Sequence, residues 1–174
     1  MTTHSSTHSF THSGISAPNA SYKLYILPIL LYCSTVYSPS LFNDQRKLEK
    51  VQRYFTRRLF KRTSREPIPN YKNRLKILDL LSINDIFIRA DLMVMYKLIN
   101  GFTPMPSIAL RFSPRVPYRL LLSRVNSNTA RKFFINRVSC LWNRLPSAVR
   151  VSTFQSFRKF LLSKSFVSFL NPRA

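Results

Sequence analysis

The sequence is poor in the residues that usually form active sites. Only two glycines, Gly14 and Gly101, occur in 174 residues, which excludes a glycine-rich phosphate-binding loop. The three histidines, His4, His8 and His12, all lie near the N-terminus, so serine–histidine or cysteine–histidine catalysis has no base elsewhere. Their spacing could present three imidazoles to a metal on a helix. Serine and threonine between them are poor helix formers, however, and low-complexity sequence is the preferred interpretation.

Acidic side chains are also scarce, six in all. Nucleotidyl transferases hold two divalent ions between closely placed carboxylates, and this chain contains neither an Asp-Asp nor an Asp-x-Asp pair. From residue 92 to the C-terminus no carboxylate side chain occurs. We therefore expect no self-contained active site: no enzyme activity, no metal site, no cofactor and no small-molecule substrate.

Cysteines and long apolar runs are few. Cys33 and Cys140 lie far apart in the sequence and fit neither a zinc pattern nor a disulfide framework, which suits a reducing compartment. The apolar stretch from Leu24 to Tyr37 is interrupted by Pro28 and is shorter than the roughly 20 residues that a membrane-spanning helix needs. We expect an intracellular protein, nuclear or cytoplasmic, with no membrane segment and no secretion signal.

Basic charge is abundant. Lysine and arginine total 28, which gives a formal net charge of +22 and a pI near 11.1. Such a field concentrates polyanions, and nucleic acid is the commonest polyanionic partner, ahead of an acidic membrane surface or an acidic protein. An apolar content of 45% is normal for a globular protein, so the excess of charge does not imply disorder along the whole chain.

Hydrophobic periodicity predicts a mostly α fold, a small domain of about five helices spanning residues 22–170. A disordered His/Ser/Thr-rich leader over 1–21 precedes it, and a Pro-rich irregular connection over 101–128 interrupts it, with short strands expected near 118–125. The segment 22–37 fits a kinked helix better than a buried strand. Further helices are expected over 44–62, 71–78, 83–100, about 128–145, and after 152. Gly101 is placed to end the predicted helix over 83–100 in the left-handed conformation.

Apolar side chains at helical spacing predict the buried faces. The predicted inward residues are Leu48, Val51, Phe55 and Leu59; Leu75 and Leu78; Ile83, Phe87, Ala90, Val94 and Leu98; Phe134, Val138, Leu141 and Leu145; and Phe154, Phe157 and Leu161. Trp142 is expected to anchor the packing.

A basic face is predicted on the helix over 44–62. Arg46, Lys50, Arg53, Arg57 and Lys61 recur at helical spacing opposite the apolar face, and Lys47, Arg58 and Arg62 widen the stripe. A solvated surface would explain such a stripe on an ordinary helix, but here the acids that normally interleave with the cations are nearly absent. We therefore interpret the face as a contact surface for the phosphates of a nucleic-acid backbone.

The arginines of the connection, Arg111, Arg115, Arg119 and Arg124, are a second group suited to backbone contact. The complete set of residues predicted to bind nucleic acid is Arg46, Lys47, Lys50, Arg53, Arg57, Arg58, Lys61, Arg62, Arg119, Arg124, Arg131 and Lys132.

Several short blocks, taken in order, resemble one protein family. They are Pro28-Ile-Leu-x-Tyr32, Val36-Tyr-Ser-Pro39, Leu48-Glu-Lys-Val-Gln-Arg53, Phe55-Thr-Arg-Arg58, Arg74-Leu75, Arg89-Ala-Asp-Leu92, Tyr96-Lys97, Phe133-Phe134, Arg137-Val138, Trp142-Asn143 and Leu145-Pro146, with a looser block from Phe154 to Leu161. Each block alone is weak, but their order over residues 22–165 resembles the C-terminal region of LINE-type, non-LTR retrotransposon reverse transcriptases. In that family this stretch forms the thumb and the region after it.

The resemblance implies the helical, nucleic-acid-gripping end of an RNA-directed DNA polymerase. The family's metal-binding palm aspartates lie upstream of this stretch and have no counterpart here. The implied partners are therefore RNA or an RNA–DNA duplex, and a polymerase palm on another chain. Leu27, Leu31 and Tyr37 depart from the arginine, glutamate and tryptophan usual in the family. Two alternatives stay open, a decayed remnant with no selected function and a basic structural protein of a ribonucleoprotein.

Overall fold

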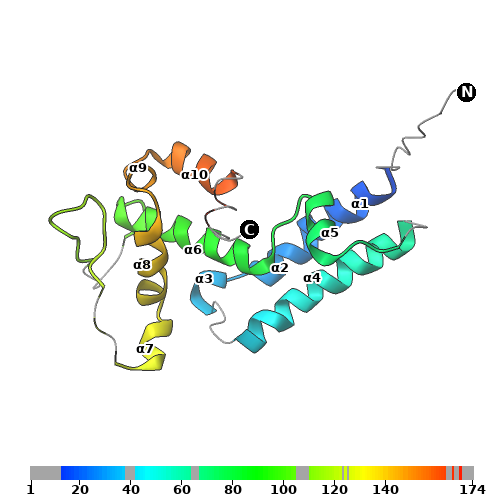
Figure 1. Ribbon diagram of the computed structural model, residues 1–174, viewed down its shortest axis with the longest axis horizontal. Coiled ribbons are helices and arrows are strands. Elements are labelled where there is room, and N and C mark those ends of the chain that lie inside the picture. Colours follow the sequence, from blue (N-terminus) through cyan, green and yellow to red (C-terminus); the bar gives the residue numbers. More distant parts are fainter. Residues whose placement is uncertain are drawn as a thin grey trace, which may run out of the picture. The chain divides into compact units, whose positions relative to one another are not determined.

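The computed structural model describes residues 13–37, 42–63, 67–104, 110–122, 124, 126–163, 166 and 169. The mostly α fold predicted from the sequence is confirmed (Figure 1). The helices, in chain order, are α1 Ser13–Ser21, the π-helix η1 Tyr22–Ile26, α2 Leu27–Leu31, α3 Ser34–Tyr37, α4 Phe42–Thr63, α5 Tyr71–Ile77, α6 Ile83–Ile99, α7 Asn128–Lys132, α8 Phe134–Arg144, α9 Ser147–Arg150 and α10 Phe154–Leu162. Two compact units form, unit 1 from residues 1–32 and 46–82 and unit 2 from residues 33–45 and 83–174.

The predicted leader needs a correction, because Ser13–Ser21 form helix α1. Tertiary contacts outweigh the poor helix propensity of this segment: Ile15 packs against the core of unit 1, and Asn19 Nδ2 donates a hydrogen bond to the Leu78 carbonyl at 3.0 Å. His4, His8 and His12 lie outside the described residues.

The segment 22–37 is helical with breaks, as expected for a kinked helix. Pro28 stands in the first turn of α2, directly after the π-helix η1. Proline lacks an N–H and clashes with the carbonyl four residues earlier, which accounts for a wider turn at this point. Cys33 then adopts a left-handed conformation, φ 51°, and separates α2 from α3.

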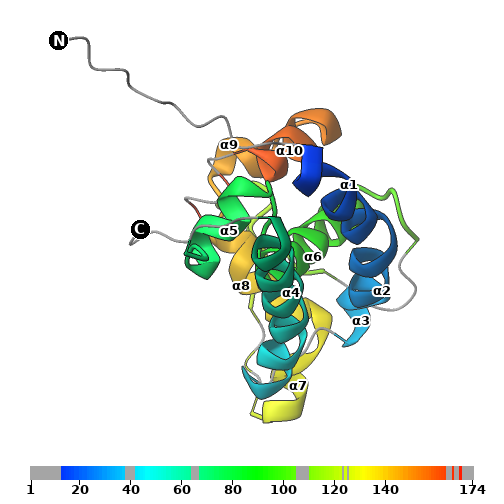
Figure 2. The ribbon, with the colours of Figure 1, turned by 90° about the vertical axis from the view of Figure 1, so that its right-hand side faces the viewer.

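Unit 1 packs around the long, uninterrupted helix α4 (Figure 2). Its core holds Tyr22, Leu59, Phe60, Leu78 and Leu80. The predicted inward face of α4 is partly wrong. Leu59 is buried, but Val51 is 41% exposed, while the polar Gln52 and Thr56 are fully buried.

Buried polar groups require hydrogen bonds, and the shifted face of α4 supplies them. Gln52 Nε2 donates to the Leu81 carbonyl at 2.8 Å, and Thr56 Oγ1 accepts from Arg74 Nε at 3.2 Å. Apolar periodicity alone cannot predict a helix that is oriented by these polar bonds.

Unit 2 is built on α6, which packs against α3, α8 and α10. Its core includes Leu92, Met95, Val138, Phe157 and Leu161. On α6 the prediction holds for Ile83 and Phe87, but Val94 and Leu98 are only partly buried. The predicted faces of α8 and α10 are confirmed.

Aromatic rings organise the centre of unit 2. Tyr96 and Phe157 stack with ring centroids 4.4 Å apart, and the fully buried Trp142 lies tilted against both. Their polar atoms are satisfied, since Trp142 Nε1 donates to the Tyr118 carbonyl and Tyr96 Oη to the Ser152 carbonyl, each at 2.7 Å. Trp142 therefore anchors the packing as predicted.

The predicted helix over 128–145 is divided at Phe133 into α7 and α8. Asn136 Nδ2 donates to the Ala130 carbonyl at 2.7 Å, a carbonyl that a continuous helix would bond to residue 134. Ser127 caps α7, and Thr153 caps α10. Gly101 ends the turn after α6 with φ 72°, as predicted.

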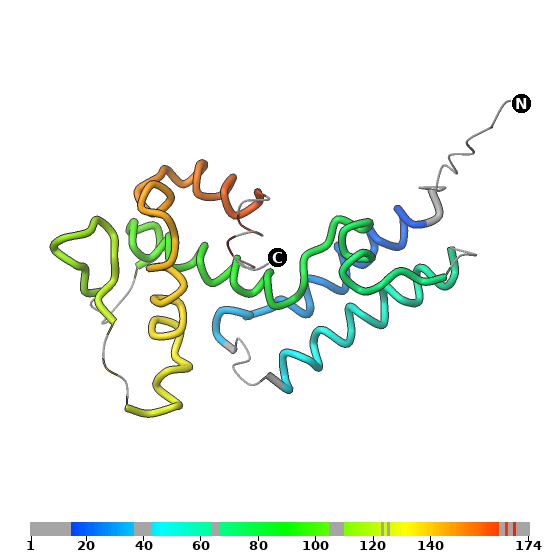
Figure 3. Tube along the Cα trace, in the orientation of Figure 1, coloured from blue at the N-terminus to red at the C-terminus, as the bar shows by residue number. Residues whose placement is uncertain are grey.

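The Pro-rich connection is irregular, as the Cα trace shows (Figure 3). Within its described part, the expected short strands reduce to one antiparallel bridge between Phe112 and Leu120.

Replacing Trp142 with alanine should lower the free energy of unfolding by about 3–5 kcal/mol, because it removes a fully buried indole and its hydrogen bond. Urea titration followed by circular dichroism at 222 nm measures the change. The matched control is Phe133→Ala, whose ring is 65% exposed and which should shift the free energy by well under 1 kcal/mol. Equal losses in the two variants would show that Trp142 does not anchor unit 2.

Candidate nucleic-acid interface

Helix α4 carries a continuous cationic surface, which we call the α4 basic face. All eight of its side chains are exposed, namely Arg46, Lys47, Lys50, Arg53, Arg57, Arg58, Lys61 and Arg62. With an axial rise of about 1.5 Å per residue, Arg46 and Arg62 are about 24 Å apart along the helix. A duplex of that length carries about 14 phosphates, so the face is long enough to contact several of them.

Tyrosines orient two of the arginines on this face. The Arg53 guanidinium lies 4.3 Å from the centroid of the Tyr71 ring, and Arg58 Nε donates to Tyr54 Oη at 3.0 Å. In a cation–π contact the guanidinium lies over the aromatic ring, and its N–H groups can still donate hydrogen bonds to other partners. These two side chains are therefore held in place without losing all their hydrogen-bond donors.

The hydroxyl of Tyr71, on α5, donates a hydrogen bond to the carboxylate of Glu49. Burial and this bond both raise the pKa of Tyr71 well above its ordinary value. Burial, and to a lesser extent Glu49, also raises the pKa of Tyr22 to about 12. The bond from Tyr71 to Glu49 therefore links α5 to α4 beside the α4 basic face.

The buried side chain of Arg74, on α5, forms a hydrogen bond to α4. It is 8% exposed and donates from Nε to Thr56 and from Nη1 to the Pro69 carbonyl at 2.8 Å. Desolvation is the main cause that lowers its pKa. A cation held by neutral oxygens contributes positive potential to unit 1 without an acid to cancel it.

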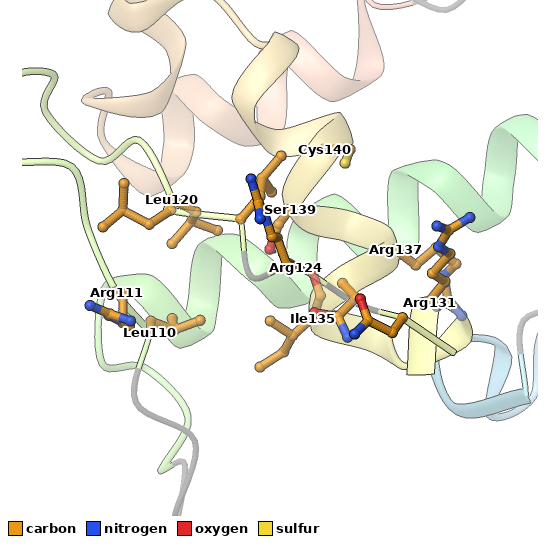
Figure 4. Close-up of a pocket in the computed structure, with 13 residues that line it drawn as sticks. Leu110, Arg111, Leu120, Arg124, Arg131, Ile135, Arg137, Ser139 and Cys140 are labelled. Atoms are coloured by element: carbon orange, nitrogen blue, oxygen red, sulfur yellow. Dashed lines mark hydrogen bonds between the residues drawn. The ribbon is translucent and has the colours of Figure 1, made fainter. Parts of the chain in front are cut away.

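Unit 2 contains a pocket of about 630 Å³, which we call the arginine pocket (Figure 4). Four of its lining residues are arginines, Arg111, Arg124, Arg131 and Arg137, and none is acidic. In this view Arg111 lies toward one end, Arg131 and Arg137 toward the other, and Arg124 between them.

Helix α8 holds the wall of the pocket in place. Asn143 accepts from the Leu120 N–H at 2.9 Å and donates to the Leu120 carbonyl at 2.8 Å. The Phe112–Leu120 bridge is extended by a bond from the Leu121 N–H to the Arg111 carbonyl at 2.8 Å. These bonds hold the connection, which has no helical periodicity, in a defined conformation at the pocket wall.

Arg137 lines the pocket and is held there by other residues of unit 2. Its Nη2 lies 3.1 Å from Asp91 Oδ1 and also donates to the Thr35 carbonyl at 3.2 Å. Asp91 is 3% exposed, and burial raises its pKa to about 6 although Arg137 opposes the shift. The pair joins α6 to α8 and fixes the guanidinium against the pocket.

All twelve cations predicted to bind nucleic acid are exposed: Arg46, Lys47, Lys50, Arg53, Arg57, Arg58, Lys61, Arg62, Arg119, Arg124, Arg131 and Lys132. The structure brings the first eight together on α4, and it places Arg124 and Arg131 in the arginine pocket. Arg119 and Lys132 do not line that pocket.

Arg137 is the one arginine of the pocket that the sequence analysis did not consider for binding. Its partner offered a signal, because Asp91 is the last acid of the chain and a buried carboxylate needs a counter-charge. Nothing in the sequence indicates which of the many cations supplies it.

Among the described residues, no group of three or more His, Cys, Asp or Glu side chains could hold a metal ion. No helix in this part of the chain is both long and apolar enough to cross a membrane. Comparisons with protein-family models, curated proteins and solved structures find no match.

Asp91 should make the stability of unit 2 depend on pH. Its pKa is raised from 3.8 to about 6 in the folded chain, so the folded state binds the proton more tightly than the unfolded state. The free energy of unfolding, relative to Asp91→Asn, should therefore increase as pH falls from 7 to 4, by up to about 3 kcal/mol.

Urea titrations of both chains across this pH range measure that difference. Asp79→Asn, at an exposed position, is the control for the loss of one carboxylate. A difference between wild type and Asp91→Asn that stays constant with pH would contradict the expected titration.

Proposed function

We propose that this chain is a non-catalytic nucleic-acid-binding module that resembles the C-terminal region of a non-LTR retrotransposon reverse transcriptase. It grips RNA or an RNA–DNA duplex by the sugar-phosphate backbone. The observation that carries the proposal is the α4 basic face, eight exposed cations on one helix that holds only two acids, Asp44 and Glu49. The ordered blocks from Pro28 to Leu161 support the family.

The type of binding follows from the chemistry of the face. Lysine and arginine contact phosphates without reading bases, and each phosphate neutralised releases condensed counterions. The module therefore binds with affinity that falls steeply with salt and with little base preference.

The non-catalytic part of the proposal rests on the sequence, which has no closely paired aspartates, and a partner chain would supply the polymerase palm. The free, exposed thiols of Cys33 and Cys140 support a reducing, intracellular location in the nucleus or the cytoplasm.

A remnant with no selected function is the principal alternative, and the departures at Leu27, Leu31 and Tyr37 favour it. The closely packed core of Leu92, Val138 and Trp142 supports a folded module instead. A cooperative thermal transition of the purified chain separates the two, because a remnant without such packing would melt gradually.

Neutralising two cations of the α4 basic face should weaken binding and reduce its salt dependence. Arg57→Gln with Lys61→Gln should lower the affinity for a blunt RNA–DNA hybrid. The slope of log K against log salt should become shallower by about one for each phosphate that the variant no longer neutralises. Fluorescence anisotropy with a labelled hybrid at several salt concentrations measures both quantities.

The matched control is Arg158→Gln with Lys159→Gln, which removes the same charge from exposed positions of α10. If it weakens binding as much as the α4 variant does, net charge alone governs affinity and the α4 basic face is not the binding surface. Strong discrimination between hybrids of different sequence would contradict backbone binding.

A further inference from the structure

We propose that the arginine pocket receives an unpaired nucleotide from a single-stranded end or overhang. This inference rests on the proposed function and extends it, since it assigns a second contact of different chemistry in unit 2. A stacked duplex presents its bases in pairs, so only an unpaired nucleotide can enter a side-chain-lined pocket.

The volume of the pocket suits this ligand. At about 630 Å³ it falls within the range of roughly 300–1,000 Å³ typical of small-ligand sites. Its lining offers the two kinds of surface that a nucleotide needs, an apolar one for the base and a cationic one for the phosphate. Leu120, Leu121, Leu122 and Ile135 offer an apolar surface to a base, and the arginines offer donors to a phosphate.

Two guanidiniums are available for that phosphate. In the described part of the chain, the side chains of Arg111 and Arg124 make no hydrogen bond or ion pair, and both are exposed. Each guanidinium has five N–H donors in a planar fork that can bind phosphate through two bonds. Arg137 also lines the pocket, but its guanidinium is already paired with Asp91 and bonded to the Thr35 carbonyl.

Polar groups along α8 suit the edge of a base. The Nδ2 of Asn136 is engaged with the Ala130 carbonyl, which fixes the orientation of the amide and leaves its Oδ1 as an acceptor. An acidic peptide could pair with the arginines equally well, but its acidic side chains would leave the apolar leucine surface without a partner. The combination of charge and apolar surface favours a nucleotide.

Cys140 provides a direct test, because its thiol is exposed and lines the pocket. In a Cys33→Ser background it is the chain's only thiol. A nucleotide in the pocket should slow its reaction with a maleimide reagent several-fold. The probes are a blunt RNA–DNA hybrid, the same hybrid with a four-nucleotide single-stranded RNA overhang, a single-stranded RNA tetramer and a poly-glutamate peptide.

We expect protection of Cys140 by the overhang hybrid and the tetramer, and little by the blunt hybrid or the peptide. Arg124→Gln or Arg111→Gln should weaken binding of the tetramer about tenfold, and binding of the blunt hybrid by a smaller factor. Arg158→Gln, an exposed arginine of α10 that does not line the pocket, is the matched control and should change neither. Circular dichroism of each variant verifies folding.

Several results would overturn the inference. They are overhang binding without protection, equal protection by the blunt hybrid, protection by poly-glutamate as strong as that by RNA, and a loss in Arg158→Gln equal to that in Arg124→Gln. The outcome for the proposed function is separate. If the blunt hybrid fails to bind while the tetramer still protects Cys140, the grip by α4 is wrong and the pocket stands. If the hybrid binds but no RNA protects Cys140, the reverse holds.

Discussion

The buried ion pair between Asp91 and Arg137 illustrates the constraint on which this molecule depends, a shortage of negative charge. Six carboxylates cannot neutralise 28 cationic side chains. Asp91 is placed in the interior of unit 2, between α6 and α8, and Glu49 is bonded to a tyrosine of α5 in unit 1. Carboxylates used in this way join one helix to another and leave the surface cationic. The excess of charge is therefore displayed at the surface rather than compensated there.

Each unit offsets this repulsion with apolar and aromatic packing. Unit 2 buries Trp142, Phe157 and Phe166 completely, and unit 1 buries Phe60 and Tyr22. Some cationic side chains are nevertheless buried in the two units. Arg74 is satisfied by a hydroxyl and a carbonyl, whereas Arg150 is 6% exposed and its Nε and Nη1 have no partner among the described residues. Burial, and then the charge of Arg119, lowers the pKa of Arg150. The fold thus tolerates positive charge in its interior where acids are lacking, at a cost that the aromatic core must exceed.

Local sequence signals predict the helices and much of their packing. The expected helix over 83–100 corresponds to Ile83–Ile99, and the one over 44–62 to Phe42–Thr63. Periodicity also identifies Val138, Leu145 and Phe157 as core residues, because their neighbours on the same faces are apolar. What the sequence does not predict depends on long-range polar bonds. The buried face of α4 is set by Gln52 and Thr56, whose partners lie on or after α5. The arginine pocket is missed for the same reason. Its cations can be seen in the sequence, but the wall that gathers Arg111 and Arg124 exists only through bonds to α8. The Arg137–Asp91 pair joins residues 46 positions apart, which no local pattern reveals.

The side chain of Asn143 has a consequence for the extended segment around Leu120. Its amide both accepts from and donates to the backbone of Leu120, so it occupies the groups that an adjoining strand would use. A short extended segment next to the Phe112–Leu120 bridge would otherwise present an open edge to other chains. A single helical asparagine therefore acts as a substitute strand neighbour at this position, and it helps to keep one copy of the protein from pairing with the next.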